Sequence, residues 1–154
     1  MAGYPVELTV NGKKVHSTAE AGETLLRFLR ERLGLTDTKC GCEKGDCGTC
    51  TVILNGKAVK SCLVLALQAN GKTVLTLKGV AREELGRKLQ ESFVEHGAVQ
   101  CGFCTPGLIV AARSFLEHHP RPTREQIREA ISGNLCRCTG YQKIVDAIYH
   151  VATG

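Results

Sequence analysis

The sequence predicts an α+β protein made of two lobes: a small mixed sheet crossed by one helix over residues 1–79, and an all-helical lobe over residues 80–154. Two observations predict this division. Short alternating apolar segments and Asn-Gly turns fill the first half, whereas the apolar residues of the second half recur every three or four positions. A third observation is the presence of nine cysteines in 154 residues, because lobes of this size have marginal cores that a metal commonly stabilises.

The first lobe follows the order hairpin, helix, strand, hairpin turn and strand. Alternating polarity predicts the strands, and each Asn-Gly pair suits the positive φ angles of a two-residue turn. The helix has four leucines on one face. The predicted segments are strands 6–10 and 13–17 around Asn11-Gly12, a helix from Leu25 to Leu33 that ends at Gly34, strand 51–54 before Asn55-Gly56, and strand 73–77.

Four helices are predicted in the second lobe, each from an apolar stripe of helical spacing. The stripes are Leu85, Leu89 and Phe93; Leu108, Ile109, Ala112, Phe115 and Leu116, closed by Pro120; Ile127, Ala130 and Ile131; and Ile144, Ile148 and Val151. Capping residues predict three helix starts. These are Thr105 followed by Pro106, Thr123 with Gln126, and Thr139 with Gln142.

The remaining composition argues against several classes of protein. The formal charge is +5, but the basic residues are scattered and aromatic residues make up only 5 %, so a nucleic-acid surface is not expected. No apolar run reaches the roughly 18 residues of a membrane span, and the start of the chain lacks the features of an export signal. We therefore expect a cytoplasmic protein without a membrane span, whose cysteines bind metal rather than form disulfides.

The first set of candidate metal ligands has the spacing C-x4-C-x2-C with a fourth cysteine further on: Cys42, Cys47, Cys50 and Cys62. This spacing is the plant-type pattern for a two-iron cluster. Glycines at 41, 45 and 48 can provide the positive φ angles and the close approach that such a loop needs, and their amides can donate to the sulfurs. Zinc also takes four cysteines, but the glycine-rich x4 spacer favours a cluster.

The second set pairs a C-x2-C with a C-x-C: Cys101, Cys104, Cys136 and Cys138. Two of these cysteines directly precede predicted helix caps, so two helix N-termini are expected to face one anionic centre. The spacing alone leaves both an iron–sulfur cluster and zinc open.

The other thiol and the histidines are not expected to be ligands. Only Cys42 preserves the x4 spacing, so Cys40 is expected to be a small packed residue. His118 and His119 end a predicted helix, where they can cap it. No histidine stands in a Cys-x-His pair, which gives no support for a Rieske centre.

In these cysteine segments the chain closely resembles the small iron–sulfur subunit of the molybdenum hydroxylases, the family of xanthine oxidase and carbon monoxide dehydrogenase. The matching stretches are residues 38–52 (TKCGCEKGDCGTCTV), 100–107 (QCGFCTPG) and 133–141 (GNLCRCTGY). The likeness spans nearly the whole chain and favours iron–sulfur over zinc at both sets. Cys40 departs from the family, whose members usually carry an apolar residue there.

The resemblance implies a plant-ferredoxin-like β-grasp domain followed by a four-helix-bundle domain, each holding one 2Fe-2S cluster. It implies that the helical cluster lies next to a molybdopterin cofactor on a large subunit, and that the other cluster faces the FAD of a medium subunit. Gln100 and Cys138 match positions that lie against the pterin. The expected assembly is a dimer of heterotrimers. The sequence has no flavin-binding or molybdenum-binding stretch, so those cofactors are expected on the partner chains.

Three functions follow as hypotheses. The first is an electron-transfer subunit of a molybdenum hydroxylase, and Gln100 favours it because that residue has no ligand role of its own. The second is a free-standing two-cluster ferredoxin, and the third is a zinc-stabilised binding module. The substrate of the assembled enzyme stays open among purines, other N-heterocycles, aldehydes, carbon monoxide and aromatic CoA thioesters.

Overall fold

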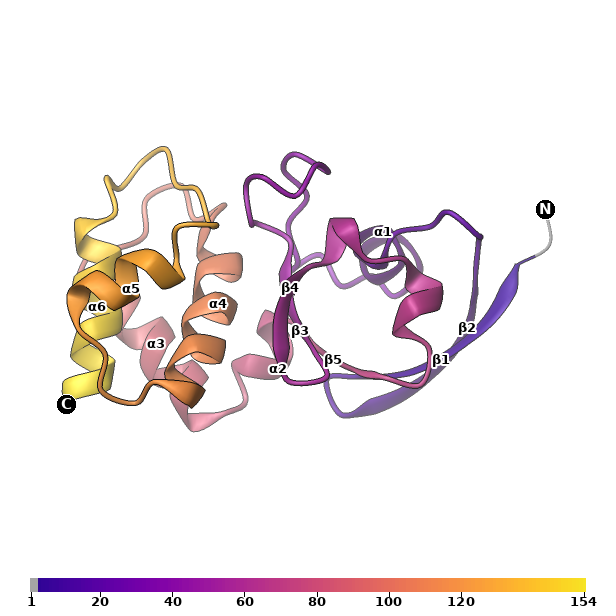
Figure 1. Cartoon of the computed structure of the whole chain (residues 1–154), viewed down its shortest axis with the longest axis horizontal. Coiled ribbons are helices and arrows are strands. Elements are labelled where there is room, and N and C mark those ends of the chain that lie inside the picture. The colour runs from indigo at the N-terminus through magenta and orange to yellow at the C-terminus, as the bar shows by residue number, and fades with distance from the viewer. Residues whose placement is uncertain (1–2) are drawn as a thin grey trace.

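The computed structural model describes residues 3–154, so Met1 and Ala2 of the predicted first lobe lie outside the described residues. The molecule is elongated, with a sheet lobe and a helical lobe arranged along its long axis, as Figure 1 shows. The C-terminus lies at the far end of the helical lobe. This arrangement confirms the predicted α+β class with the sheet preceding the helices.

The sheet has five strands in the order β2-β1-β5-β3-β4. Neighbouring strands are antiparallel except for β1 and β5, which are parallel. Both Asn-Gly hairpin turns are confirmed, with positive φ at Asn11 (50°), Gly12 (80°), Asn55 (46°) and Gly56 (81°). The strands are β1 (Tyr4–Val10), β2 (Lys13–Ala19), β3 (Thr51–Leu54), β4 (Lys57–Lys60) and β5 (Thr73–Leu75).

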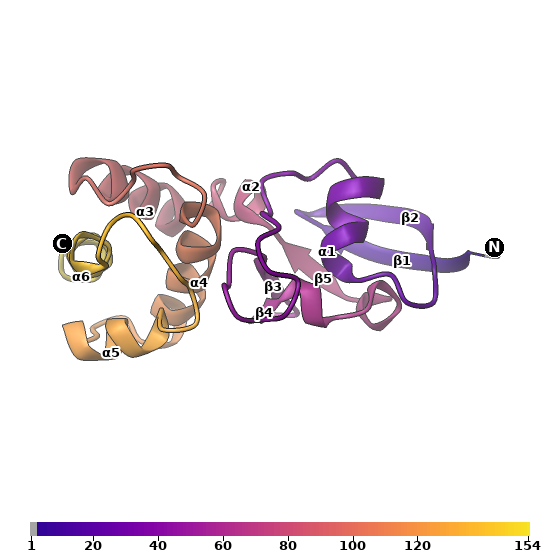
Figure 2. The same cartoon turned by 90° about the horizontal axis from the view of Figure 1, so that it is seen from above.

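One helical segment crosses the sheet, as Figure 2 shows from above. It comprises α1 (Leu25–Arg27) and a wider π-helical turn, η1 (Phe28–Arg32), and Thr24 caps it by accepting from the Arg27 amide. Its apolar face is buried against the inner face of the strands, where the core residues include Leu8, Val52 and Val74. Two short 3-10 turns, η2 (Ser61–Leu63) and η3 (Ala66–Ala69), complete the lobe.

The predicted strand 73–77 is too long, because β5 ends at Leu75. Asn11 accepts from the Thr76 amide at 2.9 Å and donates to the Thr76 hydroxyl at 3.0 Å. The first of these bonds directs the Thr76 amide to a side chain instead of a neighbouring strand, and the chain then enters α2 (Leu77–Val80).

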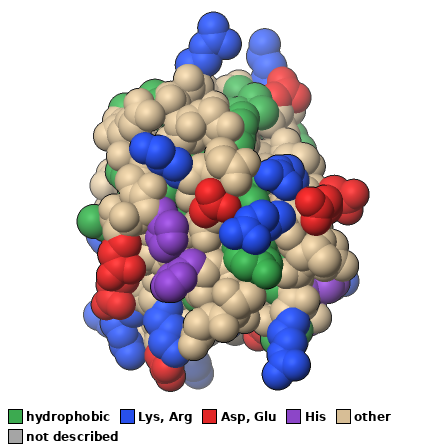
Figure 3. All heavy atoms as spheres, turned by 90° about the vertical axis from the view of Figure 1, so that its left-hand side faces the viewer, with side chains coloured by type: hydrophobic (Ala, Val, Ile, Leu, Met, Phe, Trp, Pro, Cys, Tyr) green, Lys and Arg blue, Asp and Glu red, His purple; other side chains and the backbone are tan. Residues whose placement is uncertain are grey.

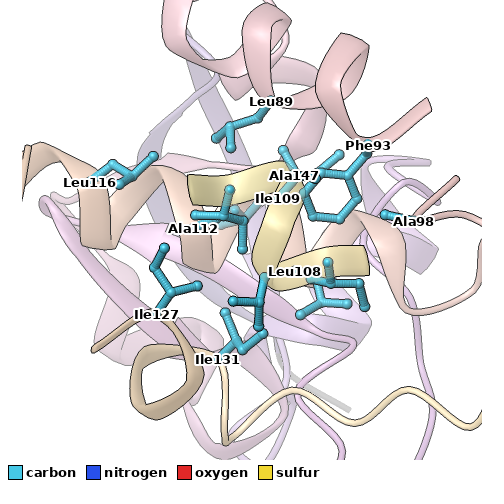
Figure 4. Close-up of a cluster of buried hydrophobic side chains, with 14 of the residues drawn as sticks. Leu89, Phe93, Ala98, Leu108, Ile109, Ala112, Leu116, Ile127, Ile131 and Ala147 are labelled. Carbon is cyan, nitrogen blue, oxygen red and sulfur yellow. The ribbon is translucent and has the colours of Figure 1, made fainter. Parts of the chain in front are cut away.

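The four predicted helices of the second lobe are confirmed, and their apolar stripes meet in one core, which Figure 4 shows in close-up. Leu89, Phe93, Leu108, Ile127 and Ala147 are all fully buried there. The Thr123–Gln126 capping box is present in both directions. The helices are α3 (Glu84–Glu95), α4 (Thr105–His118), α5 (Arg124–Ala130) and α6 (Gln142–Thr153).

Two predicted helix starts are wrong. Thr105 is the first residue of α4 and Cys104 is its N-cap, so the cap lies one residue earlier than expected. Thr139 does not cap α6, because its hydroxyl donates to the Cys136 sulfur at 3.1 Å. Helix α6 instead begins after Tyr141, whose φ of 70° is left-handed.

The surface at the end of the helical lobe carries side chains of both charges. Figure 3 shows acidic, basic and histidine side chains intermixed on that face. Within residues 3–154, no helix is long and apolar enough to cross a bilayer.

Candidate metal centres

The first candidate centre is a loop that runs from the end of η1 to the start of β3. The Cys42 sulfur accepts hydrogen bonds from the amides of Lys44 and Cys47, both at 3.4 Å. The Cys47 sulfur lies 3.2 Å from the Thr49 hydroxyl. Cys50 and Cys62 are buried and pack together against Leu26. The loop therefore carries three of the four predicted ligands of the first set, and η2 brings the fourth, Cys62, beside Cys50.

The glycines of this loop have the roles predicted from their spacing, with one difference. Gly45 and Gly48 have φ of 84° and 73°, in the left-handed region that suits glycine. Gly41 has no positive φ, but a Cβ at this position would lie 2.8 Å from the Cys47 sulfur. Gly41 is thus required for close approach rather than for its backbone angle.

The second candidate centre is assembled from two segments that are distant in sequence. The Cys101 and Cys138 sulfurs lie 3.6 Å apart, and both residues are exposed. Cys104 and Cys136 lie deeper, at the edge of the helical core. The Cys136 amide donates to the Tyr141 hydroxyl at 2.9 Å, which fixes the second segment to the start of α6.

Thr139 is the main polar neighbour of the Cys136 sulfur. Its amide and hydroxyl lie 3.4 Å and 3.1 Å from that sulfur, respectively. Burial raises the pKa of the Cys136 thiol, but the Thr139 donors, together with the Cys104 thiol and the Cys138 amide, outweigh burial and leave the pKa below its ordinary value. These neighbours favour the thiolate of Cys136, the form that binds metal.

In both centres the thiols are arranged as an inner and an outer pair. The outer pairs are Cys42 with Cys47 and Cys101 with Cys138, and the inner pairs are Cys50 with Cys62 and Cys104 with Cys136. These pairs fit a cluster in which each of two irons takes two thiols better than they fit one zinc that takes four.

Three thiols of the two centres have strongly shifted pKa values. Burial raises the pKa of Cys62 to about 12, and the neighbouring Cys50 thiol adds to the effect. Burial and Cys136 likewise raise the pKa of Cys104 to about 12. The amides of Cys47 and Lys44 lower the pKa of Cys42 to about 6. Because metal ligands must be thiolates, metal uptake must displace protons from Cys62 and Cys104.

The two centres are joined directly through the backbone. The Leu135 amide donates to the Cys47 carbonyl at 2.8 Å. Cys47 belongs to the first set of cysteines, and Leu135 directly precedes Cys136 of the second set. Both loops lie on the same long side of the molecule, the upper side in Figure 1.

Two further residues from the sequence analysis can now be placed. Gln100 is exposed, and its side-chain amide donates to the Cys138 carbonyl at 3.0 Å, so it links the two segments of the second centre. Cys40, expected to be a small packed residue, is exposed instead. Gly41 occupies the inner side of the loop against Cys47, which leaves the side chain before it outside.

Three polar residues contact these centres in ways that the sequence did not predict. Thr139, expected to cap a helix, and Tyr141 both contact Cys136. Asn134 contacts the first loop from the second. Their position within three residues of a ligand pair is the one sequence signal that points to them.

The residues present fit iron–sulfur clusters. The donor set is all thiol, all nine cysteines are free, and amide or hydroxyl donors lie beside the sulfurs. The Thr105 hydroxyl, next in the chain to Cys104, is buried without a partner among the described residues. A cluster sulfur is a suitable acceptor for it.

Comparisons with known proteins agree with this donor set. Residues 8–77 match the family described as "2Fe-2S iron-sulfur cluster binding domain", and residues 76–149 match "[2Fe-2S] binding domain". The small FeS subunit of nicotinate dehydrogenase from Eubacterium barkeri is 50 % identical over 143 residues, which is 93 % of this chain and 91 % of that protein. The iron-sulfur-binding subunit of xanthine dehydrogenase from Escherichia coli O157:H7 is 46 % identical over 145 residues, with the same two coverages of 93 % and 91 %.

A solved structure extends the likeness to three dimensions. The crystal structure of quinoline 2-oxidoreductase from Pseudomonas putida 86 contains a chain that matches with a TM-score of 0.92 and 47 % identity. The match covers 97 % of this chain and 94 % of that one. The ferredoxin-like lobe followed by a helical lobe is consistent with this match. The chain therefore belongs to the 2Fe-2S iron–sulfur subunits of the molybdenum hydroxylase family and is a component of an oxidoreductase.

Proposed function

We propose that this chain relays electrons, through two 2Fe-2S clusters, between a molybdopterin centre and FAD that partner subunits hold. The observation that carries the proposal is the hydrogen bond from the Leu135 amide to the Cys47 carbonyl. Through this bond, Cys47 of the first set is connected to Cys136 of the second set by covalent bonds and one hydrogen bond. A protein with two independent centres has no need of such a path.

The ligand assignment is part of the proposal. One cluster is bound by Cys42, Cys47, Cys50 and Cys62 in a domain over residues 1–79, and the other by Cys101, Cys104, Cys136 and Cys138 in a domain over residues 80–154. When bound, each cluster can accept and donate one electron. The protein supplies thiolates, and the donors beside Cys42 and Cys136 tune the sulfurs they contact.

Exposure and the resemblance to the family support a direction for the relay. Cys101 and Cys138 are exposed, and Gln100 beside them still has a side-chain oxygen for a polar heterocycle after its amide has bonded to Cys138. We assign this side of the helical lobe to the molybdopterin of a large subunit. The first loop then faces the FAD of a medium subunit.

The relatives named as small subunits support a partnered protein rather than a free ferredoxin. We expect a large subunit, a medium subunit and this chain, assembled as a dimer of heterotrimers.

The nine free cysteines suit a reducing compartment, which fits the cytoplasm.

Iron and sulfide analysis of the purified protein tests the assignment of the clusters. Two clusters require two spectroscopically distinct paramagnetic signals after reduction, because their surroundings differ. Cys47→Ser should lose half of the iron and one signal, while Cys40→Ser, the matched control, keeps both. Stoichiometric zinc with little iron, or loss of a cluster in Cys40→Ser, would contradict the assignment.

The relay itself is tested in the assembled complex, which should copurify with a large molybdenum-containing chain. Gln100→Leu should keep both cluster signals yet slow their reduction by the substrate of the complex. An unchanged rate would show that Gln100 does not couple the pterin to this chain. A protein that purifies alone with both clusters would favour the free ferredoxin instead.

A further inference from the structure

The side chain of Asn134 lies at the junction between the two cysteine loops. It is only 6 % exposed although it is polar. Its Nδ2 donates to the Gly48 carbonyl at 2.9 Å and to the Thr51 hydroxyl oxygen at 3.2 Å. Asn134 belongs to the helical lobe, two residues before Cys136, whereas both acceptors belong to the first loop and the strand after it. One side-chain amide thus binds the two loops together.

The Gly48 carbonyl is the meeting point of this junction. It accepts from the Thr51 amide at 3.1 Å and from the Thr51 hydroxyl at 2.6 Å, in addition to Asn134. Gly48 directly follows Cys47, whose own carbonyl accepts from Leu135. Fixing the Gly48 carbonyl therefore also fixes the peptide group between Cys47 and Gly48. The carbonyl of that peptide group accepts the hydrogen bond from Leu135 that joins the two loops.

The backbones at this junction are too close for side chains to intervene. A Cβ on Gly48 would overlap the Gly133 carbonyl oxygen and lie 2.9 Å from the Asn134 Cα. A Cβ on Gly107, in the first turn of α4, would lie 3.1 Å from the Thr49 Cα. Because bare backbone meets bare backbone, there is no flexible side chain to absorb a shift, and the spacing of the loops depends on the polar contacts that Asn134 makes.

We propose that Asn134 is a positioning residue that sets the electronic coupling between the two cluster sites. The proposal rests on the ligand assignment given above and deepens the proposed relay. Asn134 has two N–H groups for two acceptors, so an aspartate or an aliphatic side chain of the same size cannot make these bonds. Its loss leaves the eight cysteines in place but frees the hydrogen bond between Cys47 and Leu135 to lengthen.

The test compares magnetic coupling with cluster content in the purified protein that carries both clusters. When both clusters are reduced, each is paramagnetic, and the splitting of their low-temperature resonance signals reports how strongly they interact. Asn134→Leu should keep the iron content and the integrated intensity of both signals, but lose the splitting between them. Electron transfer between the clusters after rapid partial reduction should become slower.

A second variant keeps the test usable if Asn134→Leu folds poorly. Thr51→Val removes one acceptor of Asn134 from a strand that tolerates valine, and should weaken the splitting. Thr51→Ser retains the hydroxyl and should restore the splitting of the unchanged protein. Ser92→Ala is the control for general loosening, because Ser92 is also buried and donates to a backbone carbonyl, that of Ala147, at 2.8 Å within the helical lobe.

The outcomes separate this inference from the proposed function. Unchanged splitting in Asn134→Leu and Thr51→Val, with both clusters present, would overturn the positioning role. Equal loss of splitting in Ser92→Ala would overturn it as well. The relay between molybdopterin and FAD is not measured here, since no partner subunit takes part, so its failure would appear only in the copurification and substrate-reduction experiments.

Discussion

The two cysteine loops solve the same problem of holding four thiols together by different means. The first centre holds three of its thiols in one short stretch of chain, with left-handed backbone at Glu43, Gly45 and Gly48 and amide donors at the Cys42 sulfur, and takes the fourth, Cys62, from η2. The second centre is held by side chains: Gln100 binds the Cys138 carbonyl across its two segments, and the Tyr141 hydroxyl binds the Cys136 amide within the second segment. The first depends on local backbone conformation, and the second depends on helix packing.

This difference determines which substitutions each centre tolerates. A change of backbone freedom should affect the first loop most, because glycine angles produce its shape. Loss of a side-chain hydrogen bond should affect the second centre most, because such bonds hold its cysteine segments in place. The predictions below test this contrast, in order of decreasing effect.

Gly48→Ala should produce the largest effect. A left-handed alanine costs about 1–2 kcal/mol, and its Cβ would overlap the Gly133 carbonyl, which adds about 1–3 kcal/mol. Iron at the first centre should be lost and the free energy of unfolding should fall. Gly56→Ala is the matched control, since its φ is also positive (81°) but nothing lies within 4 Å of its Cβ. Equal effects of the two substitutions would refute a special role for the junction.

Tyr141→Phe should weaken the second centre without affecting the first. The buried Cys136 amide would lose its acceptor at 2.9 Å, which costs about 1–3 kcal/mol. Denaturant unfolding measures that loss, and only the signal of the helical cluster should change shape. Tyr149→Phe, which keeps the ring beneath Arg124, is the control. A change in the first cluster's signal would argue against separate support of the two centres.

Thr139→Val should lower the reduction potential of the helical cluster. The lost hydroxyl donates to the Cys136 sulfur, and donors to the sulfurs favour the more negative reduced state. A bond worth about 0.5–1.5 kcal/mol corresponds to about 20–65 mV for one electron. Redox titration followed by paramagnetic resonance measures the change, and Thr139→Ser should keep the original potential. A rise in potential would have the wrong sign for this explanation.

Asp146→Asn should have the smallest effect, on the packing of α5 against α6. Gln142 and Arg124 lower the pKa of Asp146, so the carboxylate stabilises the fold above its unfolded-state pKa and loses that contribution as the pH falls through its lowered pKa. At neutral pH the substitution should cost about 0.2–1 kcal/mol, as expected of a partly exposed pair. The difference from the unchanged protein should shrink below about pH 4 in acid-unfolding measurements. A difference that grows on acidification would contradict this sign.

Much of the fold could be predicted because its signals are local. Asn11-Gly12 and Asn55-Gly56 need only their own backbone preferences to form hairpin turns, and Thr123 and Gln126 are close enough in sequence to cap a helix by themselves. The helices of the second lobe could be predicted because each buries one face, which places apolar residues every three or four positions. The end of β5 could not be predicted, because Asn11, 65 residues away, takes the Thr76 amide.

The sequence by itself determined the two sets of cysteines, the glycines of the first loop and the membership of the family. Those features depend on the order of residues within a few positions, which the chain carries wherever it folds. The tertiary structure decided that the thiols lie in pairs, and that the Thr139 hydroxyl donates to a sulfur instead of capping a helix. It also decided that Cys40 is exposed. It also placed Asn134 on Gly48, 86 residues away, and no local preference can encode a contact that exists only after two lobes have packed together.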